Sequence, residues 1–229
     1  MNLDIKPLSS MRITYSEGTL LEETAPSDPL LLFADWLAQA RANLPADAEP
    51  NAVALATASA ETGRPSCRMV LLKDFDARGL TIFTNYESRK ASELESNPWA
   101  AMTLWWGQRS VRFEGRIERI TDAESDQYYE SRPLSSRIGA WASPQSKAIA
   151  SRSDLEQLEQ SFQKKFQDVI DPPRPPHWGG YRLVPDIAEF WQGRQSRLHD
   201  RLRYTRDIQL DRLNDPDAHG PWTRCRLAP

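Results

Sequence analysis

Five stretches of strand-forming residues follow one another between residues 51 and 120, and their spacing constrains the fold more than any other feature. Each contains apolar or β-branched residues at consecutive or alternating positions, and the second and third are joined by the turn Asp76-Ala77-Arg78-Gly79, which is typical of a hairpin. The stretches are AVALATAS (52–59), SCRMVLLKDF (66–75), LTIFTNY (80–86), WAAMTLWWG (99–107) and SVRFEGRIERI (110–120). Helices separate groups of strands without a repeated βαβ pattern, so the sequence predicts a mainly β fold, an antiparallel sheet closed into a barrel with peripheral α-helices.

Two segments carry clear helix signals before residue 100. Residues 27–43 begin with Ser27 or Asp28 as N-cap and Pro29 at the first helical position, followed by apolar residues at helical spacing. Residues 87–95 form a shorter amphipathic segment that ends before Pro98, because a residue that precedes proline avoids the helical region.

Two capping boxes predict helices in the second half of the chain. They are Thr121 with Glu124, opening 121–131, and Ser153 with Glu156, opening 153–167. Further strands are expected from YRLVPDIAEFWQG (181–193) and RLHDRLRY (197–204). Residues 1–26 lack periodicity, so we expect a flexible arm there and one domain over residues 27–229.

The charge balance limits the kinds of partner. The 229 residues include 29 Lys and Arg against 32 Asp and Glu, a net charge of −3, so no global field attracts nucleic acid and any anion site must be local. The two cysteines, Cys67 and Cys225, have no metal-ligand spacing, so we expect reduced thiols and no metal site. No apolar run is long enough for a secretory signal or a membrane span, so we expect a cytoplasmic protein.

Common nucleotide and hydrolase motifs are absent, but several segments concentrate anion-binding groups. Ser88, Arg89 and Lys90 stand at a predicted helix start, where free N–H groups favour a phosphate. A solvated helix start with charges for solubility is the alternative. Arg68 and Lys73 differ in strand parity and are expected on opposite faces, serving two anions or simply marking the strand ends.

Two later segments add guanidinium groups. Residues 128–146 combine Arg132 with serine and glutamine side chains, which suits a phosphate ester or a polar loop that caps two helices. Read as a strand, residues 197–204 place on one face the side chains of Arg197, His199, Arg201 and Arg203. Stacked like charges need carboxylate partners or a ligand, so a ligand or catalytic role for this face stays open.

Taken in order, these segments resemble the pyridoxamine (pyridoxine) 5′-phosphate oxidase family. The resemblance runs from about Asn51 to Pro229 and is carried by RMVLLK, FTNYESRK, EGRIERI, YYESRP, SSRIGAWAS, QS, HWGGYR, EFWQG, RLHDR and RLAP. It implies an FMN-binding split β-barrel and a homodimer with the FMN site at the interface, including a C-terminal dimerisation region. It also implies oxidation of pyridoxamine or pyridoxine 5′-phosphate to pyridoxal 5′-phosphate, with O₂ reduced to hydrogen peroxide.

The resemblance also assigns residues. For FMN it implies Arg68, Met69, Val70, Leu71, Phe83, Thr84, Arg89, Lys90, Gln145, Ser146, Trp191 and Arg201. For the substrate it implies Lys73, Tyr128, Arg132 and Ser136 around the phosphate, Arg197 and His199 as the catalytic pair over the ring, and Arg12 and Tyr15 from an N-terminal segment.

One position departs from the family pattern. The strand that enters EGRIERI usually begins Arg-Gln-Val in the family, with a longer loop before it, whereas this chain has Arg109-Ser110-Val111. Ser110 is too short for the glutamine contact with the flavin, although Gln108 could replace it from a shifted register. We therefore expect weaker FMN affinity or a rearranged contact.

Two other functions remain open at this point. One is a split-barrel flavin oxidase that acts on another substrate, as phenazine-pathway relatives do, which would lack the residues for the substrate phosphate. The other is a flavin or pyridoxal-phosphate carrier without catalysis, which would bind without turnover.

Overall fold

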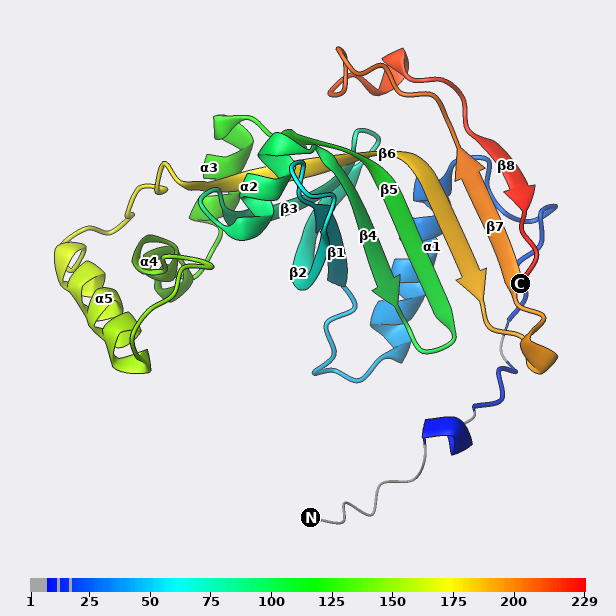
Figure 1. The fold of residues 1–229 in the computed structure, drawn as a ribbon, viewed down its shortest axis with the longest axis horizontal. Helices are drawn as coiled ribbons and strands as arrows, with labels where there is room; N and C mark the ends of the chain where they lie inside the picture. The colour runs from blue at the N-terminus through cyan, green and yellow to red at the C-terminus, as the bar shows by residue number, and fades with distance from the viewer. Residues whose placement is uncertain (1–7, 12, 17) are drawn as a thin grey trace.

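The fold is built on an antiparallel sheet that closes on itself. The structure, a computed structural model, describes residues 8–11, 13–16 and 18–229. The strands follow the order β3-β2-β1-β4-β5-β6-β7-β8, and an additional pairing of β3 with β6 closes the first six into a barrel (Figure 1). Their bounds are β1 Ala52–Ala58, β2 Pro65–Asp76, β3 Gly79–Asn85, β4 Trp99–Trp105, β5 Arg109–Arg119, β6 Trp178–Gln192, β7 Asp200–Thr205 and β8 Thr223–Arg226. The predicted barrel is confirmed.

Strand β6 joins the barrel to the outer part of the sheet. Its first half pairs with β3, from Trp178 opposite Asn85 to Leu183 opposite Leu80. Its second half pairs with β7, from Ile187 opposite Thr205 to Gln192 opposite Asp200, and β5 runs along its other side. One 15-residue strand therefore connects the barrel to the β7–β8 extension, which lies at the right of Figure 1.

The core fills the barrel and continues under the first helix. Val53 and Leu55 of β1 and Val111 and Phe113 of β5 are fully buried, as the alternation of apolar and polar residues predicts. Helix α1, Pro29–Asn43, packs against this core through Phe33, whose ring lies 5.2 Å from that of Phe113. Asp28 is its N-cap and Pro29 its first residue, as expected.

The remaining α-helices are peripheral to the barrel. They are α2 Arg89–Ser96, α3 Asp122–Glu130, α4 Leu134–Ala142 and α5 Arg152–Lys165; short 3₁₀ turns span Leu8–Ser10, Gln195–Arg197 and Pro216–Ala218. The Thr121–Glu124 capping box is present at α3. The box predicted for α5 is wrong by two residues, because the N-cap is Ser151 and its partner is Asp154.

Helix α4 contradicts the alternative interpretation of residues 128–146 as a polar loop. The segment LSSRIGAWA is helical and buries Ile138, Ala140 and Ala142. Its N-cap position, Pro133, makes no side-chain capping bond, so no local signal opens it. The helix packs against α5 and, through Ala140, against Tyr129 and Trp178, and this tertiary packing outweighs the weak propensity of its serines and glycine.

The segment before α1 contacts the far end of the sheet. Arg224 of β8 donates to the carbonyl oxygens of Glu22, Ala25 and Pro26. Arg226 forms ion pairs with Glu22 and Asp200. In the described part of the chain, no helix has the length and apolar character needed to cross a membrane.

Candidate functional site

One cavity gathers most of the side chains expected at the site. It has a volume of about 580 Å³ and lies between β2, the end of β3, the start of α2 and the end of α3. Five of its described lining residues are Arg or Lys and none is Asp or Glu. The lining residues of this first cavity are Ser66, Cys67, Arg68, Met69, Val70, Leu71, Lys73, Phe83, Thr84, Arg89, Lys90, Tyr128, Arg132, Gln145, Ser146 and Trp178. Such a lining suits an anionic ligand.

The start of α2 supplies part of this positive charge. Ser88 caps the helix by accepting from the backbone N–H of Ala91, and the first turn contains no acidic residue. Lys90 is buried, and its Nζ donates to Thr84 Oγ1 at 3.0 Å and Gln145 Oε1 at 2.6 Å. Burial and then the charge of Arg68 lower the pKa of Lys90 to about 8. A helix start with a buried ammonium group that has only neutral partners is suited to bind a phosphate.

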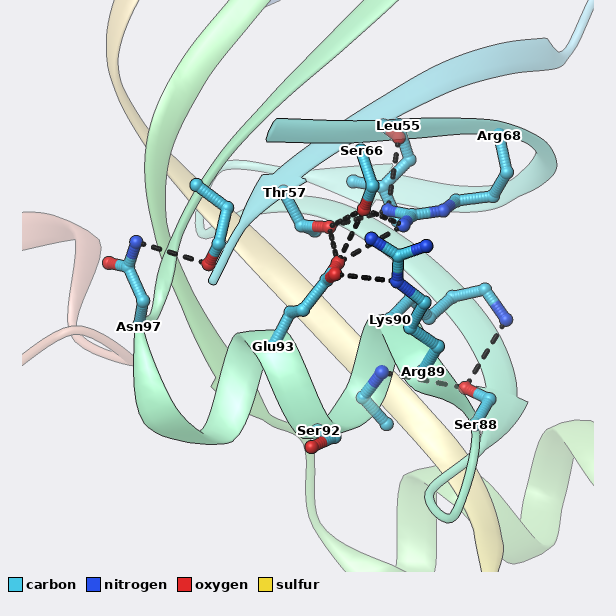
Figure 2. Close-up of polar contacts among 12 residues, drawn as sticks. Leu55, Thr57, Ser66, Arg68, Ser88, Arg89, Lys90, Ser92, Glu93 and Asn97 are labelled. Atoms are coloured by element: carbon cyan, nitrogen blue, oxygen red, sulfur yellow. Dashed lines mark hydrogen bonds and ion pairs between the residues drawn. The ribbon is translucent and has the colours of Figure 1, made fainter. Parts of the chain in front are cut away.

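Arg68 and Arg89 lie beside that lysine and share one carboxylate, as Figure 2 shows. Arg68 Nη2 donates to Glu93 Oε2 at 3.2 Å, and Arg89 Nε donates to Glu93 Oε1 at 2.9 Å. Thr57 and Ser66 also donate to Glu93 Oε2. Burial disfavours ionisation of Glu93, but these hydrogen bonds outweigh it and lower the pKa of Glu93 to about 2.

An aromatic wall faces the cations. The ring centroids of Phe83 and Tyr128 lie 3.8 Å apart in a stacked arrangement, and Phe83 also stacks with Trp178. The guanidinium of Arg132 lies 4.6 Å from the Trp178 ring. Its Nη1 atom is buried without a hydrogen-bond partner among the described residues, and burial lowers the pKa of Arg132. A buried guanidinium atom without a hydrogen-bond partner fits an anion bound at this wall.

A second cavity, of about 730 Å³, lies where β6 leads into β7. It is lined by Ser10, Met11, Ile13, Thr14, Tyr15, Arg194, Gln195, Ser196, Arg197 and His199. It shares no lining residue with the first cavity. The described part of the chain therefore presents these as two separate cavities.

His199 is held by its neighbours in this second cavity. Its Nδ1 accepts from the backbone N–H of Arg194 at 3.0 Å, which leaves the ring proton of neutral imidazole on Nε2. The ring lies 4.6 Å from that of Trp191 and 5.5 Å from that of Tyr15. The histidine can thus offer an Nε2–H donor from a fixed ring.

The arginines of residues 197–204 do not form the single strand face that parity predicted. Strand β7 begins only at Asp200, and Arg197 belongs to a 3₁₀ turn with φ of 61°. Only Arg201 and Arg203 share a strand face, and Arg201 forms an ion pair with Glu189 at 2.9 Å. The carboxylate partner that such a face requires is therefore supplied within the chain for Arg201.

Parity also failed for Arg68 and Lys73, which line the same cavity. The β2–β3 pairing shifts register between Leu72 and Asp74, so the alternation is interrupted at Lys73. A bulge of this kind depends on the partner strand, and the sequence of β2 alone does not show it.

Most of the expected residues are thus placed in one of the two cavities. Ten of the twelve residues expected to bind FMN line the first cavity; the exceptions are Trp191 and Arg201. Three residues expected to bind the substrate, Lys73, Tyr128 and Arg132, line the same cavity. The second cavity is lined by Tyr15, Arg197 and His199, which were also expected to bind the substrate. Ser136 on α4 lines neither cavity, and Arg12 lies outside the described residues.

The sequence reasoning assigned no role to two residues that the geometry places here. Trp178 forms the aromatic wall, and Glu93 joins two lining arginines. Trp178 carries no local signal of this role. Glu93 does, because it stands four residues after Arg89 on a predicted helix, where opposite charges are neighbours.

Comparison with known families gives matches over most of the chain. The family described as "Pyridoxamine 5′-phosphate oxidase" matches residues 38–160. The family described as "Pyridoxine 5′-phosphate oxidase C-terminal dimerisation region" matches residues 178–229. The two matched ranges include both cavities except for the residues before position 38.

Curated relatives match over nearly the full length of both chains. The pyridoxine/pyridoxamine 5′-phosphate oxidase of Methylibium petroleiphilum is 52% identical over 225 residues, covering 97% of this chain and 98% of its own. The protein of the same name from Burkholderia multivorans is also 52% identical over 225 residues, covering 97% and 99%.

Solved structures show a similar fold. PhzG from Burkholderia lata 383, in complex with tetrahydrophenazine-1-carboxylic acid, has a TM-score of 0.79 and 32% identity, covering 92% of this chain and 98% of its own. A pyridoxamine 5′-phosphate oxidase-related, FMN binding protein from Nostoc punctiforme has a TM-score of 0.62 and 18% identity, covering 90% and 98%, a likeness of fold alone.

Proposed function

This chain belongs to the pyridoxamine 5′-phosphate oxidase family, and on that basis we propose that it is an FMN-dependent oxidase of pyridoxamine and pyridoxine 5′-phosphate. The product is pyridoxal 5′-phosphate, and its formation from the amine substrate also takes up water and releases ammonia. When bound, FMN would accept a hydride from C4′ of the substrate and pass two electrons to O₂, which leaves as hydrogen peroxide. No protein nucleophile is required for this chemistry.

The observation that carries this proposal is the division of cations within the first cavity. Arg68, Arg89 and Lys90 gather at the start of α2, whereas Lys73 and Arg132 also line the cavity, Arg132 against the aromatic wall. FMN and the substrate each carry a phosphate, so two groups of cations match two anions. The unpaired Nη1 of Arg132 and the carboxylate-free lining fit this occupancy.

We assign the FMN phosphate to the start of α2 and the substrate phosphate to Lys73, Tyr128 and Arg132. Ser136 is proposed as a further substrate contact, although it lines neither cavity. Met69, Val70 and Leu71 of β2 and Phe83, Thr84, Gln145 and Ser146 would contact the rest of the flavin. Trp191 and Arg201 would complete the flavin site from the β6–β7 pair, where they lie opposite each other.

The separation of the two cavities supports a homodimer. Arg197 and His199 do not line the first cavity of their own chain, and they fall within the range that matches the dimerisation region. We propose that a second copy brings its Arg197 and His199 over the substrate bound in the first cavity. Tyr15, and Arg12 beyond the described residues, would close the same side.

The chemical part of Arg197 and His199 is positioning and proton placement. Arg197 lies in a 3₁₀ turn before β7, where Ser196 and Arg197 have positive φ values, and its side chain is exposed. His199 offers Nε2–H as a donor to a substrate oxygen while Arg194 holds its other nitrogen. Holding the substrate so that its C4′ hydrogen faces the flavin would increase the rate by orientation.

A phenazine-type oxidase is the second candidate, because PhzG is 32% identical over most of the chain. The cations that we assign to the substrate phosphate favour the phosphorylated vitamers, since a ligand without phosphate would leave the buried Nη1 atom of Arg132 unpaired.

The direct test is the spectrum and turnover of the purified protein. We expect oxidised-flavin absorption bands and aerobic conversion of pyridoxine 5′-phosphate with one hydrogen peroxide released per product. Tight flavin binding without turnover would indicate a carrier, and turnover only of a non-phosphorylated dihydrophenazine would indicate the phenazine-type enzyme. Either result would contradict the proposal.

A further inference from the structure

Glu93 has an unusual place in the first cavity, because it is an acid that touches the cations without lining the space. Its side chain is only 8% exposed, and it pairs with both Arg68 and Arg89. In the described part of the chain, no other carboxylate forms an ion pair with a lining cation. A buried carboxylate beside a phosphate site weakens the electrostatic attraction for the anion, so its presence needs a physical reason.

The geometry of Arg68 gives the first part of that reason. Its Nη1 donates to Leu55 O at 3.3 Å and Thr57 Oγ1 at 2.6 Å, and its Nη2 donates to Ser66 and Glu93. All four Nη hydrogens are thereby directed into the protein, as Figure 2 shows. Arg68, which lines the cavity, is thereby fixed in one orientation and keeps its positive charge beside a ligand bound there.

Arg89 is held differently. It stands four residues before Glu93 on α2, and only its Nε is used, in the 2.9 Å bond to Glu93 Oε1. Its side chain is 61% exposed, so without this bond it would be free in solvent. The bond fixes the guanidinium plane and leaves both Nη groups available for a phosphate.

Glu93 also lowers the net charge of the cation cluster at the start of α2. Arg68, Arg89 and protonated Lys90 carry three positive charges, and Glu93 reduces the sum to two. A phosphate monoester carries about −2 near neutral pH. The cluster therefore matches the charge of the phosphate that it would bind.

We propose that Glu93 is a positioning residue for the flavin phosphate. Its carboxylate fixes Arg68 and Arg89 before the ligand arrives, so that binding does not have to order two long side chains. This role rests on the proposed function, since it requires that a flavin phosphate binds at the start of α2. Fixing the two arginines in advance strengthens phosphate binding more than the loss of one positive charge weakens it.

The test compares FMN with riboflavin, which lacks the phosphate. Apo-protein of the full chain is titrated with each flavin, and the ratio of the riboflavin Kd to the FMN Kd measures the contribution of the phosphate. Glu93→Gln removes the charge, and Glu93→Asp keeps the charge but is too short to bridge both arginines. In both variants we expect the ratio to fall by roughly tenfold, while the riboflavin Kd changes little.

Glu95→Gln is the matched control. Glu95 lies on the same helix and also loses an ion pair, with Arg119, but it contacts no cation of the cavity, so the ratio should equal that of wild type. If Glu93→Gln does not fold, Glu93→Asp decides alone.

Four results would overturn the role of Glu93. A raised ratio in Glu93→Asp would show that repulsion between the Glu93 carboxylate and the phosphate outweighs its effect on the arginines. An unchanged ratio would show that phosphate binding does not depend on how Glu93 holds Arg68 and Arg89. Equal losses for FMN and riboflavin would show a general structural role. A wild-type protein that binds riboflavin as well as FMN would remove the phosphate site itself, and the proposed function with it.

Discussion

At the scale of single residues, the cations of the first cavity are distinguished by their partners. Arg68 and Arg89 have a carboxylate, whereas Lys90 is buried beside hydroxyl and amide groups and the half-buried Arg132 lies against an aromatic ring. Burial lowers the pKa of Lys90 and of Arg132. Groups with neutral partners gain most from an anion, so they should respond most clearly to ligand and to pH.

We predict that FMN affinity decreases as the pH rises through about 8, the pKa of Lys90. Between about pH 7 and that value Lys90 is protonated and the phosphate is a dianion, so the affinity is nearly constant. Above it, the bound phosphate stabilises the ammonium form, so binding takes up a proton. Calorimetric titration in two buffers of different ionisation enthalpy measures this uptake. Riboflavin is the control ligand, and a Lys90→Gln variant that kept the full pH dependence would contradict the assignment.

Lys90 should have the opposite effect on the stability of the apo-protein. Its folded pKa of about 8 lies below the ordinary value of 10.5, so burial of the charged form costs stability below pH 8. That cost decreases as pH rises from about 8 to 10.5, and stability from this group therefore increases in that window.

Ser110 gives a prediction about the flavin ring. It lies on β5 opposite Trp105 and Trp191, and the alternative contact from Gln108 is engaged, because Gln108 Oε1 accepts from the N–H of Ser16 at 3.1 Å. We expect Ser110→Gln to tighten FMN binding by the worth of one neutral hydrogen bond, about 0.5–1.5 kcal/mol. Titration of wild-type and Ser110→Gln apo-protein with FMN measures the difference in affinity. Equal affinities would contradict the prediction that Ser110 weakens FMN binding.

At the scale of elements, the barrel depends on the contact between β3 and β6. Gly79 has a φ of 144°, and a Cβ atom there would lie 2.1 Å from the carbonyl oxygen of Leu183 on β6. We predict that Gly79→Ala destabilises the protein by more than about 2 kcal/mol, because backbone strain and a clash with the main chain add. Denaturant unfolding measures the free energy.

Gly107 provides the matched comparison for this prediction. Its φ is 68°, but a Cβ atom would meet no atom within 4 Å, so Gly107→Ala should cost only the strain of about 1–2 kcal/mol. Equal losses in the two variants would show that the β3–β6 contact does not limit stability.

The elements also show what the sequence could predict. Strands and capped helices were found because hairpin spacing, capping boxes and proline are local signals. Arg89 and Lys90 were correctly placed at the start of a helix, α2. Helix α4 was missed because it has no side-chain cap and is held by packing on Trp178 and α5. For α5, Ser151 and Ser153 both precede an acidic residue by three positions, and local pattern did not choose between them.

The candidate site was predictable to a different extent. Family resemblance named residues that the structure gathers into two cavities, but strand parity misplaced Arg197 and His199 because two positive φ values end the alternation. Trp178 received no role, since its importance depends on neighbours distant in sequence. Glu93 received none although its spacing from Arg89 on the predicted helix was a local signal. Local patterns predict elements, whereas cavities arise from contacts between elements.

At the scale of the whole molecule, the account requires two copies of the chain. The first cavity holds the cations and the aromatic wall, and the second holds Arg197 and His199. A twofold dimer uses the same surfaces on both chains, so each of its two sites would combine the first cavity of one chain with the second cavity of the other. A substitution that inactivates one cavity of one chain should therefore abolish activity only at the site to which that cavity contributes.

The most direct measurement mixes two inactive variants, Arg132→Ala and Arg197→Ala, under conditions in which dimers exchange. A hybrid dimer has one site with both halves intact, and random mixing makes half of the dimers hybrids, so we predict recovery of roughly a quarter of wild-type activity on pyridoxine 5′-phosphate. Mixing Arg132→Ala with Lys73→Ala, both in the first cavity, should recover none. Absence of recovery in the first mixture, with hybrids present, would contradict a shared site.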